Sequence, residues 1–331
     1  MKRLRMRNET ANNKHLMLFS GRAFPELAEE IAATLETNLV PTRALAYANS
    51  EIYVRFEESV RGSDAFVIQS HTAPVNEWIM EQLIMVDALK RASAKRITVV
   101  APFYPYARQD KKHLGREPIS ARLVADLYKA AGADRIMSVD LHASQIQGFF
   151  DGPVDHLWGL PVLSEYVRKH YDTSEMCVVS PDAGRVRLAD MWTDELGCPL
   201  AIIHKRRDHE KANTVAVHEV VGDVQGKTCI LVDDMIDTAG TITQAALALQ
   251  ERGASKVICA ATHAVFSGPA VERLNASGMA EIIVTNTLPI RTAEPIDNLT
   301  VLSIAPLIAR AINAVFRDGS VTSLFGGQAY K

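Results

Sequence analysis

The chain has 331 residues, enough for about two domains with a sizeable core, which excludes a disulfide-stapled miniprotein and a disordered chain. Its 36 Lys and Arg against 39 Asp and Glu give a formal net charge of −3, so the chain as a whole offers no field for nucleic acid or an anionic membrane. An apolar content of 47% with only 6% aromatic residues favours buried parallel strands and helices over an aromatic-rich β-sandwich.

Short apolar runs alternate with helical patterns along the chain. The expected strands begin at Leu16, Ala65, Ile97 and Ile136 in the first half, and at Cys177, Leu200, Cys229, Val257 and Ile282 in the second. Amphipathic spacing predicts helices over Pro25–Glu36, Asn76–Ser93, Ile119–Ala131, Thr241–Arg252 and Pro306–Phe316. This alternation predicts parallel sheets with helical crossovers. One segment differs, because Thr214–Lys227 alternates Val with polar residues and carries two glycines, which predicts a hairpin at a domain edge.

A weak internal repeat indicates two related units. In each half a helix-ending Gly-Ala pair precedes a strand whose histidine, His142 or His263, falls ten residues after the glycine. Gly, Pro and Asp cluster near 152–158, where we place the boundary between domains at 14–157 and 158–331. The alternative is that such helix–Gly–strand joints look alike in any α/β protein.

The cysteines and the N-terminus bear on the cellular compartment. The four cysteines are well separated, with no C-x-x-C pair and no histidine at zinc-ligand spacing, so we expect reduced core thiols. The basic N-terminal stretch is not followed by an apolar signal region, and no apolar run is long enough to cross a membrane. We therefore expect a cytoplasmic protein with no membrane contact.

The most informative segment runs from Cys229 to Thr241 and contains Asp233, Asp234 and Asp237. A buried strand ends in two carboxylates, and a short Thr/Gly loop then opens an Ala/Leu-rich helix, which is where an open α/β sheet binds ligands. Backbone N–H groups at the helix N-terminus can cradle a phosphate. Three carboxylates would repel a phosphate. We therefore assign the three aspartates to hydrogen bonds with sugar hydroxyls and to Mg²⁺. A solvated strand end with an N-cap would account for one aspartate but not comfortably for three.

Two basic segments each follow an expected strand. Their cations are Arg108, Lys111 and Lys112 in the first segment, and Lys205, Arg206 and Arg207 in the second. In phosphoryl transfer a protein chiefly positions groups and neutralises spreading charge, so a cationic loop that closes over phosphates is a suitable device. From the residues alone, a solvated run of charge is an equal alternative for the first segment and the better reading of the second.

Several segments, together with the Asp-Asp loop, resemble the ribose-phosphate pyrophosphokinase family of the common phosphate-activated class. They are Tyr106–Lys112, Val139–His142, Gln147–Phe150, Val179–Asp182 and His204–Arg207. Phosphoribosyltransferases share only the Asp-Asp loop. The resemblance runs from about Leu16 to Phe325 and implies an α/β fold of two related phosphoribosyltransferase-type domains, each a mainly parallel sheet flanked by helices. It also implies a C-terminal tail that packs back on the N-terminal domain.

The resemblance implies a reaction. The β,γ-diphosphoryl group of Mg–ATP would be transferred to the anomeric hydroxyl of ribose 5-phosphate, giving phosphoribosyl pyrophosphate and AMP for nucleotide, His and Trp biosynthesis. Mg²⁺ would be the cofactor, inorganic phosphate an activator and a homohexamer the assembly, with ATP sites completed across subunits and no nucleic-acid partner. The alternatives are a phosphoribosyltransferase that uses phosphoribosyl pyrophosphate, and a catalytically silent regulatory subunit of the same fold.

The resemblance also implies residue roles. The catalytic residues would be Lys205 and Arg207. ATP would be bound by Asn49, Ser50, Glu51, Arg108 and Gln109. Ribose 5-phosphate would be bound by Arg207, Asp233, Asp237, Thr238, Ala239, Gly240 and Thr241. The metal would be bound by His142 and Asp182, although Mg²⁺ prefers oxygen and a lone strand-end histidine is more often structural. Tyr47 and Ser50 depart from the family's adenine-binding loop.

Overall fold

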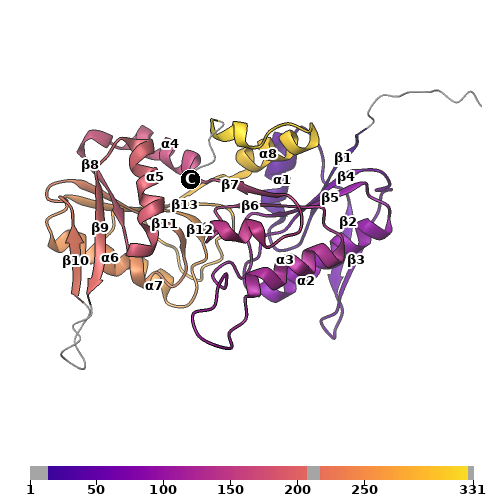
Figure 1. Ribbon diagram of the computed structural model, residues 1–331, viewed down its shortest axis with the longest axis horizontal. Coiled ribbons are helices and arrows are strands. Elements are labelled where there is room, and N and C mark those ends of the chain that lie inside the picture. Colours follow the sequence, from indigo (N-terminus) through magenta and orange to yellow (C-terminus); the bar gives the residue numbers. More distant parts are fainter. Residues whose placement is uncertain (1–13, 207–216, 327–331) are drawn as a thin grey trace, which may run out of the picture.

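The computed structural model describes residues 14–206 and 217–326, and these form two mainly parallel sheets that lie side by side (Figure 1). The first sheet has the order β1-β4-β5-β6-β7, and all neighbouring strands in it are parallel. Its strands are β1 (Leu16–Ser20), β4 (Asp64–Ile68), β5 (Arg96–Ala101), β6 (Arg135–Val139) and β7 (Val154–Leu157). β4 is buried along its whole length, which explains its near-continuous apolar sequence.

The second sheet has the order β10-β9-β8-β11-β12-β13-β14. Its strands are β8 (Met176–Ser180), β9 (Leu200–Arg206), β10 (Val217–Val221), β11 (Thr228–Ile236), β12 (Lys256–Ala264), β13 (Glu281–Thr285) and β14 (Leu299–Leu302). Every pairing is parallel except that of β10 with β9. The expected α/β architecture and all nine expected strands are confirmed.

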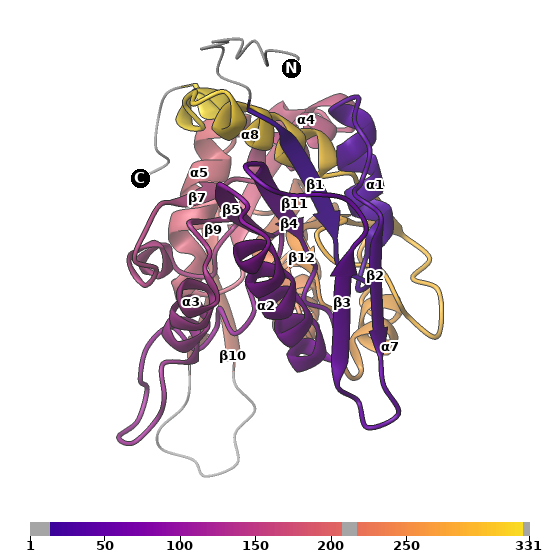
Figure 2. The same cartoon turned by 90° about the vertical axis from the view of Figure 1, so that its right-hand side faces the viewer.

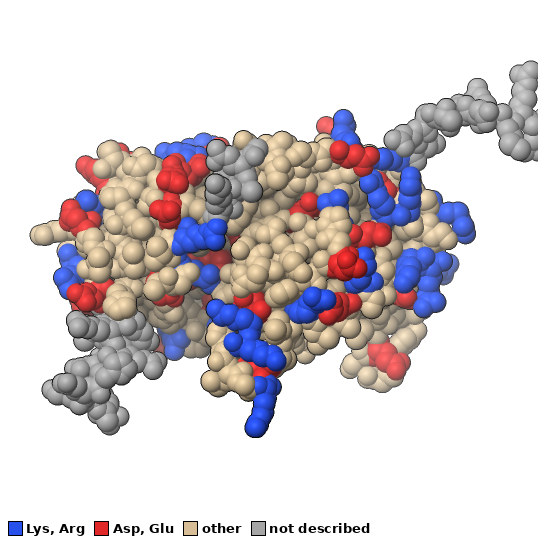
Figure 3. Space-filling model, in the orientation of Figure 1, with Lys and Arg blue, Asp and Glu red and all other residues tan. Residues whose placement is uncertain are grey.

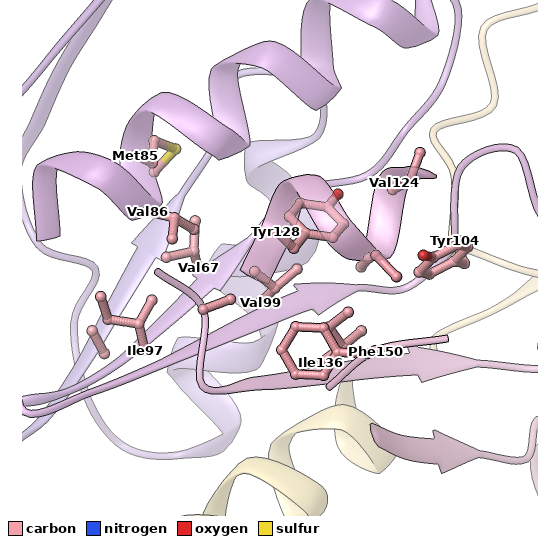
Figure 4. Packing of buried hydrophobic residues seen from close by; sticks show 14 of the residues in the cluster. Val67, Met85, Val86, Ile97, Val99, Tyr104, Val124, Tyr128, Ile136 and Phe150 are labelled. Carbon is pink, nitrogen blue, oxygen red and sulfur yellow. The ribbon is translucent and has the colours of Figure 1, made fainter. Parts of the chain in front are cut away.

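Helices cover both faces of the first sheet. One face carries α2 (Val75–Arg91) and α3 (Ser120–Ala131), and Figure 4 shows Met85, Val86 and Tyr128 packed over strand residues such as Val99. The other face carries α1 (Pro25–Thr34) and α8 (Ala305–Phe316), which pack against each other. The chain thus leaves the second sheet and returns to the first, where α8 lies beside α1 (Figure 1). The domain boundary at 157/158 stays a prediction.

The second sheet is also covered on both faces. α4 (Leu160–His170) and α5 (Val186–Leu196) enclose one apolar cluster around Trp192, and α6 (Gly240–Glu251) and α7 (Ala270–Asn275) enclose the other. The remaining short elements are the 3-10 helices η1 (Ser144–Gly148), η2 (Thr173–Glu175), η3 (Ala183–Arg185) and η4 (Thr322–Phe325). The five expected helices are present, whereas α4, α5 and α7 were not predicted.

The hairpin expected over Thr214–Lys227 is wrong in its pairing. β10 is an edge strand, but its antiparallel partner is the earlier strand β9. The segment that contains Gly222 and Gly226 instead leads to β11, which lies on the far side of β9 and β8. Gly222 has φ +121°, and a Cβ there would lie within 3 Å of Ala201, so this crossover needs a glycine for its close approach. The alternation predicted β structure at a domain edge, and β10 does lie at the edge of the sheet, but the alternation does not specify the strand with which β10 pairs.

A two-stranded antiparallel hairpin, β2 (Thr42–Ala46) and β3 (Ile52–Phe56), was also missed. It forms a sheet of its own and packs beside α2 (Figure 2). Its strands are short and half-buried, and Arg43 and Arg55 lie opposite each other, so no long apolar run marks it.

The structure bears on two expectations, that the cysteines are core thiols and that no segment spans a membrane. All four cysteines are buried and unpaired, which confirms core thiols. Within residues 14–206 and 217–326, no helix combines the length and the apolar composition that a membrane span requires.

Candidate active site

Loops from both sheets meet in a pocket of about 200 Å³. Arg108 comes from the segment after β5, His142 from the segment after β6, and Asp182 and Arg185 from the segment after β8. The remaining wall is the end of β11 and its loop into α6, residues 233–242. The pocket therefore lies at the carboxyl ends of parallel strands, where open α/β sheets bind ligands. Figure 3 shows Lys and Arg side chains gathered on the projecting loop between β5 and α3, whose exposed cations include Arg108 and Lys111.

The loop between β11 and α6 has the strand–loop–helix order that the sequence predicts. Ala239 adopts a left-handed conformation with φ +60°, and α6 begins at Gly240 without a side-chain cap. The first backbone N–H groups of a helix have no partners within the helix. Thr238, Ala239, Gly240 and Thr241 all line the pocket, so this uncapped helix N-terminus faces a space that can hold an anion.

Two neighbouring carboxylates at the end of β11 share one arginine. Nε of Arg185 lies 2.7 Å from Asp233 Oδ1, and its Nη2 lies 2.8 Å from Asp234 Oδ1. His142 Nδ1 lies 2.8 Å from the other oxygen of Asp234. Asp234 is the fixed anion and can only accept, so Nδ1 carries the proton and donates it to Asp234, and in the neutral ring the lone pair is then on Nε2. Nη2 of Arg185 lies 3.0 Å from the same Nδ1, and with this tautomer that approach of two donors is no hydrogen bond.

The two carboxyl groups are electrostatically different. Burial, followed by the charge of Asp234, raises the pKa of Asp233 well above its usual value. Burial also opposes ionisation of Asp234, but the hydrogen bond from His142 and the charge of Arg185 lower the pKa of Asp234 to about 2. Asp234 is therefore the fixed anion of the pair, and it orients both His142 and Arg185.

Asp182 caps the short helix η3. Its Oδ1 accepts hydrogen bonds from the N–H groups of Gly184 (2.8 Å) and Arg185 (3.1 Å). Within the described residues, no group of three or more His, Cys, Asp and Glu side chains is placed to hold a metal ion. Mg²⁺ is commonly held by one or two protein ligands together with substrate phosphates. The second oxygen of Asp182 and Nε2 of His142 fit that smaller donor set, because both residues line the pocket.

Arg108 and Asp237 form an ion pair across the pocket, between the first sheet's loop and the second sheet's loop. Asp237 also accepts a hydrogen bond from Ser267. The family resemblance implies separate roles for these two residues, Arg108 on ATP and Asp237 on the sugar. In this structure the two expected binding groups neutralise each other, so a ligand that takes one of them releases the other.

A second hollow of about 400 Å³ lies beside Arg108 and Gln109. It is lined by Phe103, Tyr106 and Ala107 as well, so aromatic rings and a guanidinium face one space. Gln109 Oε1 accepts a hydrogen bond from Ser120 at 2.7 Å, which orients this amide. Such a hollow suits a planar base on its apolar side and phosphates on its basic side.

The segment that carries His142 is held from both sheets. Asp140 has φ +36°, and its Oδ2 accepts hydrogen bonds from Gly159 N (3.0 Å) and from Thr262 of β12. A Cβ on Gly159 would lie 2.7 Å from that oxygen, so only glycine allows this approach. His263 Nε2 donates to the Asp140 carbonyl at 3.1 Å. The turn is thus fixed on three sides before His142 enters the pocket.

His156 contacts the same segment, and its titration should make the free energy of unfolding depend on pH. Its Nε2 accepts from Leu141 N at 3.0 Å, so the neutral ring is required. Burial lowers the pKa of His156 from 6.5 to about 4. The unfolded chain therefore binds the proton first, and this stabilisation is complete above pH 6.5 and lost as pH falls towards 4. The shift corresponds to roughly 3 kcal/mol.

The variant His156→Gln keeps an acceptor oxygen for Leu141 N and removes the titration. Urea unfolding at pH 7, 6 and 5 should show a shallower loss of stability for this variant than for the wild type, by up to about 1.4 kcal/mol per pH unit. Identical slopes for the two proteins would show that His156 does not titrate in this way.

Some expected site residues are not brought to the pocket. Asn49, Ser50 and Glu51 form the exposed tip of the β2–β3 hairpin, where Asn49 Oδ1 accepts from Glu51 N, and they line neither hollow described above. The backbone of Lys205 lies in β9 opposite His218, and its side chain is outside the description. Arg207 lies outside the described residues.

Sequence reasoning missed Arg185. The sequence places this arginine three residues after Asp182, just past the end of an expected strand, but only the structure shows that this strand, β8, is the neighbour of β11. Thr262 was missed as well, because it sits inside a strand that reads as pure core. In both cases the function depends on which strands are neighbours, and the sequence pattern did not contain that information.

Comparison with known proteins places this site in a family. Residues 16–132 match the model of the N-terminal domain of ribose phosphate pyrophosphokinase, and residues 212–326 match the phosphoribosyl synthetase-associated domain. The chain is 66% identical over 320 residues to the ribose-phosphate pyrophosphokinase of Streptomyces coelicolor, covering 97% of this chain and 99% of the relative. It is 63% identical over 321 residues to that of Mycobacterium tuberculosis, covering 97% and 98%.

A solved structure agrees with this assignment. The crystal structure of phosphoribosylpyrophosphate synthetase from Mycobacterium smegmatis matches with a TM-score of 0.88 at 62% identity, covering 92% of this chain and all of that chain. This match confirms the expected fold of two phosphoribosyltransferase-type domains. Because two relatives more than 60% identical are matched over nearly their whole length, the chain belongs to the ribose-phosphate pyrophosphokinase family.

Proposed function

We propose that this protein transfers the β,γ-diphosphoryl group of ATP to the anomeric hydroxyl of ribose 5-phosphate, giving phosphoribosyl pyrophosphate and AMP. One observation carries the proposal. A single pocket combines an uncapped helix N-terminus with the carboxylates of β11, and an arginine from the other sheet enters it. An anion and vicinal hydroxyls on one molecule, beside a polyphosphate on another, satisfy all three features.

The loop between β11 and α6 would bind ribose 5-phosphate. The N–H groups of residues 238–241 would hold the 5-phosphate, while Asp233 and Asp237 accept hydrogen bonds from the ring hydroxyls. Asp237 exchanges Arg108 for the sugar in this scheme. The sugar's neutral hydroxyls would then contact hydrogen-bond acceptors, and its phosphate would contact hydrogen-bond donors.

The hollow beside Gln109 would bind ATP. Its aromatic lining suits adenine, and Arg108 stands between this hollow and the sugar pocket, where the phosphates must cross. Asn49, Ser50 and Glu51 sit on an exposed hairpin tip, which suits a contribution to the adenine site of a neighbouring subunit. The proposed assembly is a homohexamer in the cytoplasm, with inorganic phosphate as activator.

Mg²⁺ would be held by His142 and Asp182 together with phosphate oxygens. When bound, it supplies charge neutralisation on the transferred phosphates. The chain contributes the orientation of these ligands, since Asp234 fixes the tautomer of His142 and the η3 cap fixes Asp182.

The chemical step needs no dedicated base in this scheme. The anomeric oxygen bonds to the β-phosphorus, the bond from that phosphorus to the oxygen of the α-phosphate breaks, and the hydroxyl proton leaves to solvent. Lys205 and Arg207 would neutralise the charge that spreads over the transferring group. Alignment of the two substrates in adjacent pockets supplies the remaining rate enhancement.

The test is the identity of the nucleotide product. Purified protein with ribose 5-phosphate, ATP and Mg²⁺ should release AMP in equal amount to the phosphoribosyl pyrophosphate formed, and inorganic phosphate should increase the rate. ADP as the only nucleotide product, or turnover that requires a nucleobase, would point to a different transferase. Inactivity at saturating substrate, phosphate and Mg²⁺ would indicate a silent regulatory subunit.

A further inference from the structure

Arg185 is the central cation of the pocket in the part of the chain that the structure describes. It is the last residue of η3, directly before α5. β8 pairs with β11, so a residue that follows β8 reaches the carboxyl end of β11. The cap from Asp182 to the N–H of Arg185 holds the backbone from which the side chain extends.

The guanidinium bridges two carboxylates of one strand end. Its Nε and Nη2 lie 2.7 Å and 2.8 Å from oxygens of Asp233 and Asp234, and the arginine side chain is only 20% exposed. A planar fork can serve two acceptors at once in a fixed direction, which an ammonium group cannot. Asp233 thus has one oxygen held by Arg185, and that same oxygen also accepts from Asp234 N at 2.8 Å. Neither of these two contacts involves Oδ2, the other oxygen of Asp233.

We propose that Arg185 is a positioning residue for the sugar: it acts through Asp233, holding one carboxylate oxygen so that the other is presented to a ribose hydroxyl. The inference rests on the proposed function, because it names the side chain that sets affinity for the sugar. Two adjacent buried carboxylates repel each other, and the bridging guanidinium is what allows both to stay in the pocket with their observed orientation.

The geometry separates this role from ATP binding. Both ion pairs described for the Arg185 side chain are with Asp233 and Asp234, and Arg185 does not line the hollow beside Gln109. Asp182 contacts only the backbone N–H of Arg185, which the alanine variant keeps, and among the described residues the one approach of the side chain to a proposed metal ligand is the 3.0 Å between Nη2 and His142 Nδ1. Its removal should therefore weaken sugar binding far more than nucleotide binding. A merely structural arginine would lower thermal stability and affect both substrates alike.

The test compares Arg185→Ala with Arg185→Lys by steady-state kinetics. We expect Arg185→Ala to raise the KM for ribose 5-phosphate at least about tenfold and the KM for ATP less than about threefold, as expected for loss of a charge-assisted hydrogen bond. Arg185→Lys should fall between Arg185→Ala and the wild type, because lysine restores the charge without the fork. Guanidinium ion at low millimolar concentration should lower the raised KM of Arg185→Ala and leave the wild type unchanged.

The matched control is Arg168→Ala. It breaks the ion pair between Arg168 of α4 and Glu195 of α5, whose charged atoms lie 2.6 Å apart on helices that cover the same sheet. It should leave both KM values unchanged. A wild type that forms no AMP would refute the proposed function itself. If the wild type forms AMP, an unchanged sugar KM in Arg185→Ala overturns the inference, as does a parallel rise of both KM values without guanidinium rescue.

Discussion

Replacing Lys205 by alanine should lower kcat by about 1,000-fold while the affinity for ATP changes little. The expected size is that of removing one group that stabilises transition-state charge. Lys205 is the last but one residue of β9, and its proposed partner is charge that appears only as the diphosphoryl group moves. ATP binds before that charge develops. The substitution should therefore change the binding free energy of ATP only slightly.

The measurement pairs single-turnover rates with direct titration of a non-hydrolysable ATP analogue. A matched control is Lys227→Ala, which removes a half-buried lysine paired with Asp223 at 3.1 Å in the segment between β10 and β11. That control should keep the wild-type rate. A Lys205→Ala variant with near-wild-type kcat would show that the cationic segment has another purpose.

Replacing Asp237 by asparagine should raise the dissociation constant of ribose 5-phosphate by about 10- to 100-fold, because a hydrogen bond to a charged acceptor contributes roughly 1.5–3 kcal/mol. The substitution keeps the shape and removes the charge. It also removes the Arg108 ion pair, so Arg108 is freed for phosphates without a competitor. We therefore expect the affinity for ATP to stay equal or to rise slightly.

Calorimetric titration of each substrate alone separates these effects from turnover. Asp190→Asn serves as the control, since Asp190 is an exposed residue of α5 away from the pocket lining. Equal weakening of both substrates by Asp237→Asn would contradict the separation of sugar and nucleotide sites. Unchanged sugar affinity would place the ribose elsewhere.

The sequence predicted the parts of the site that are contiguous in the chain. The strand, the acids and the helix start between Cys229 and Thr241 follow one another, so their arrangement needs only local rules. The parts that depend on neighbouring strands were not predictable. Arg185 reaches Asp233 because β8 lies beside β11, and Arg108 reaches Asp237 because loops of the two sheets meet in one pocket.

The fold shows the same division. Nine strands of the two sheets were found from buried apolar runs, which are characteristic of parallel strands. The short, largely half-buried edge strands β7 and β14 were not predicted. The β2–β3 hairpin was missed because its strands are half-buried and short. The partner of β10 was assigned wrongly. An alternating pattern indicates a strand with one solvated face, but it does not specify which strand pairs with it.

The overall charge of −3 conceals an ordered separation. Cations gather on the loop after β5, and anions gather at the end of β11, where one arginine from each sheet meets them. A whole-chain sum carries no information about a pocket that holds both signs.

Positional tracing of phosphorus tests the central claim most directly, namely that the sugar hydroxyl attacks the β-phosphorus. ATP labelled separately at the α-, β- and γ-phosphorus is incubated with the protein, ribose 5-phosphate and Mg²⁺, and the products are separated. The account predicts that the β and γ labels both move to the sugar and that the α label stays in AMP. Transfer of the γ label alone, with ADP carrying the β label, would contradict it.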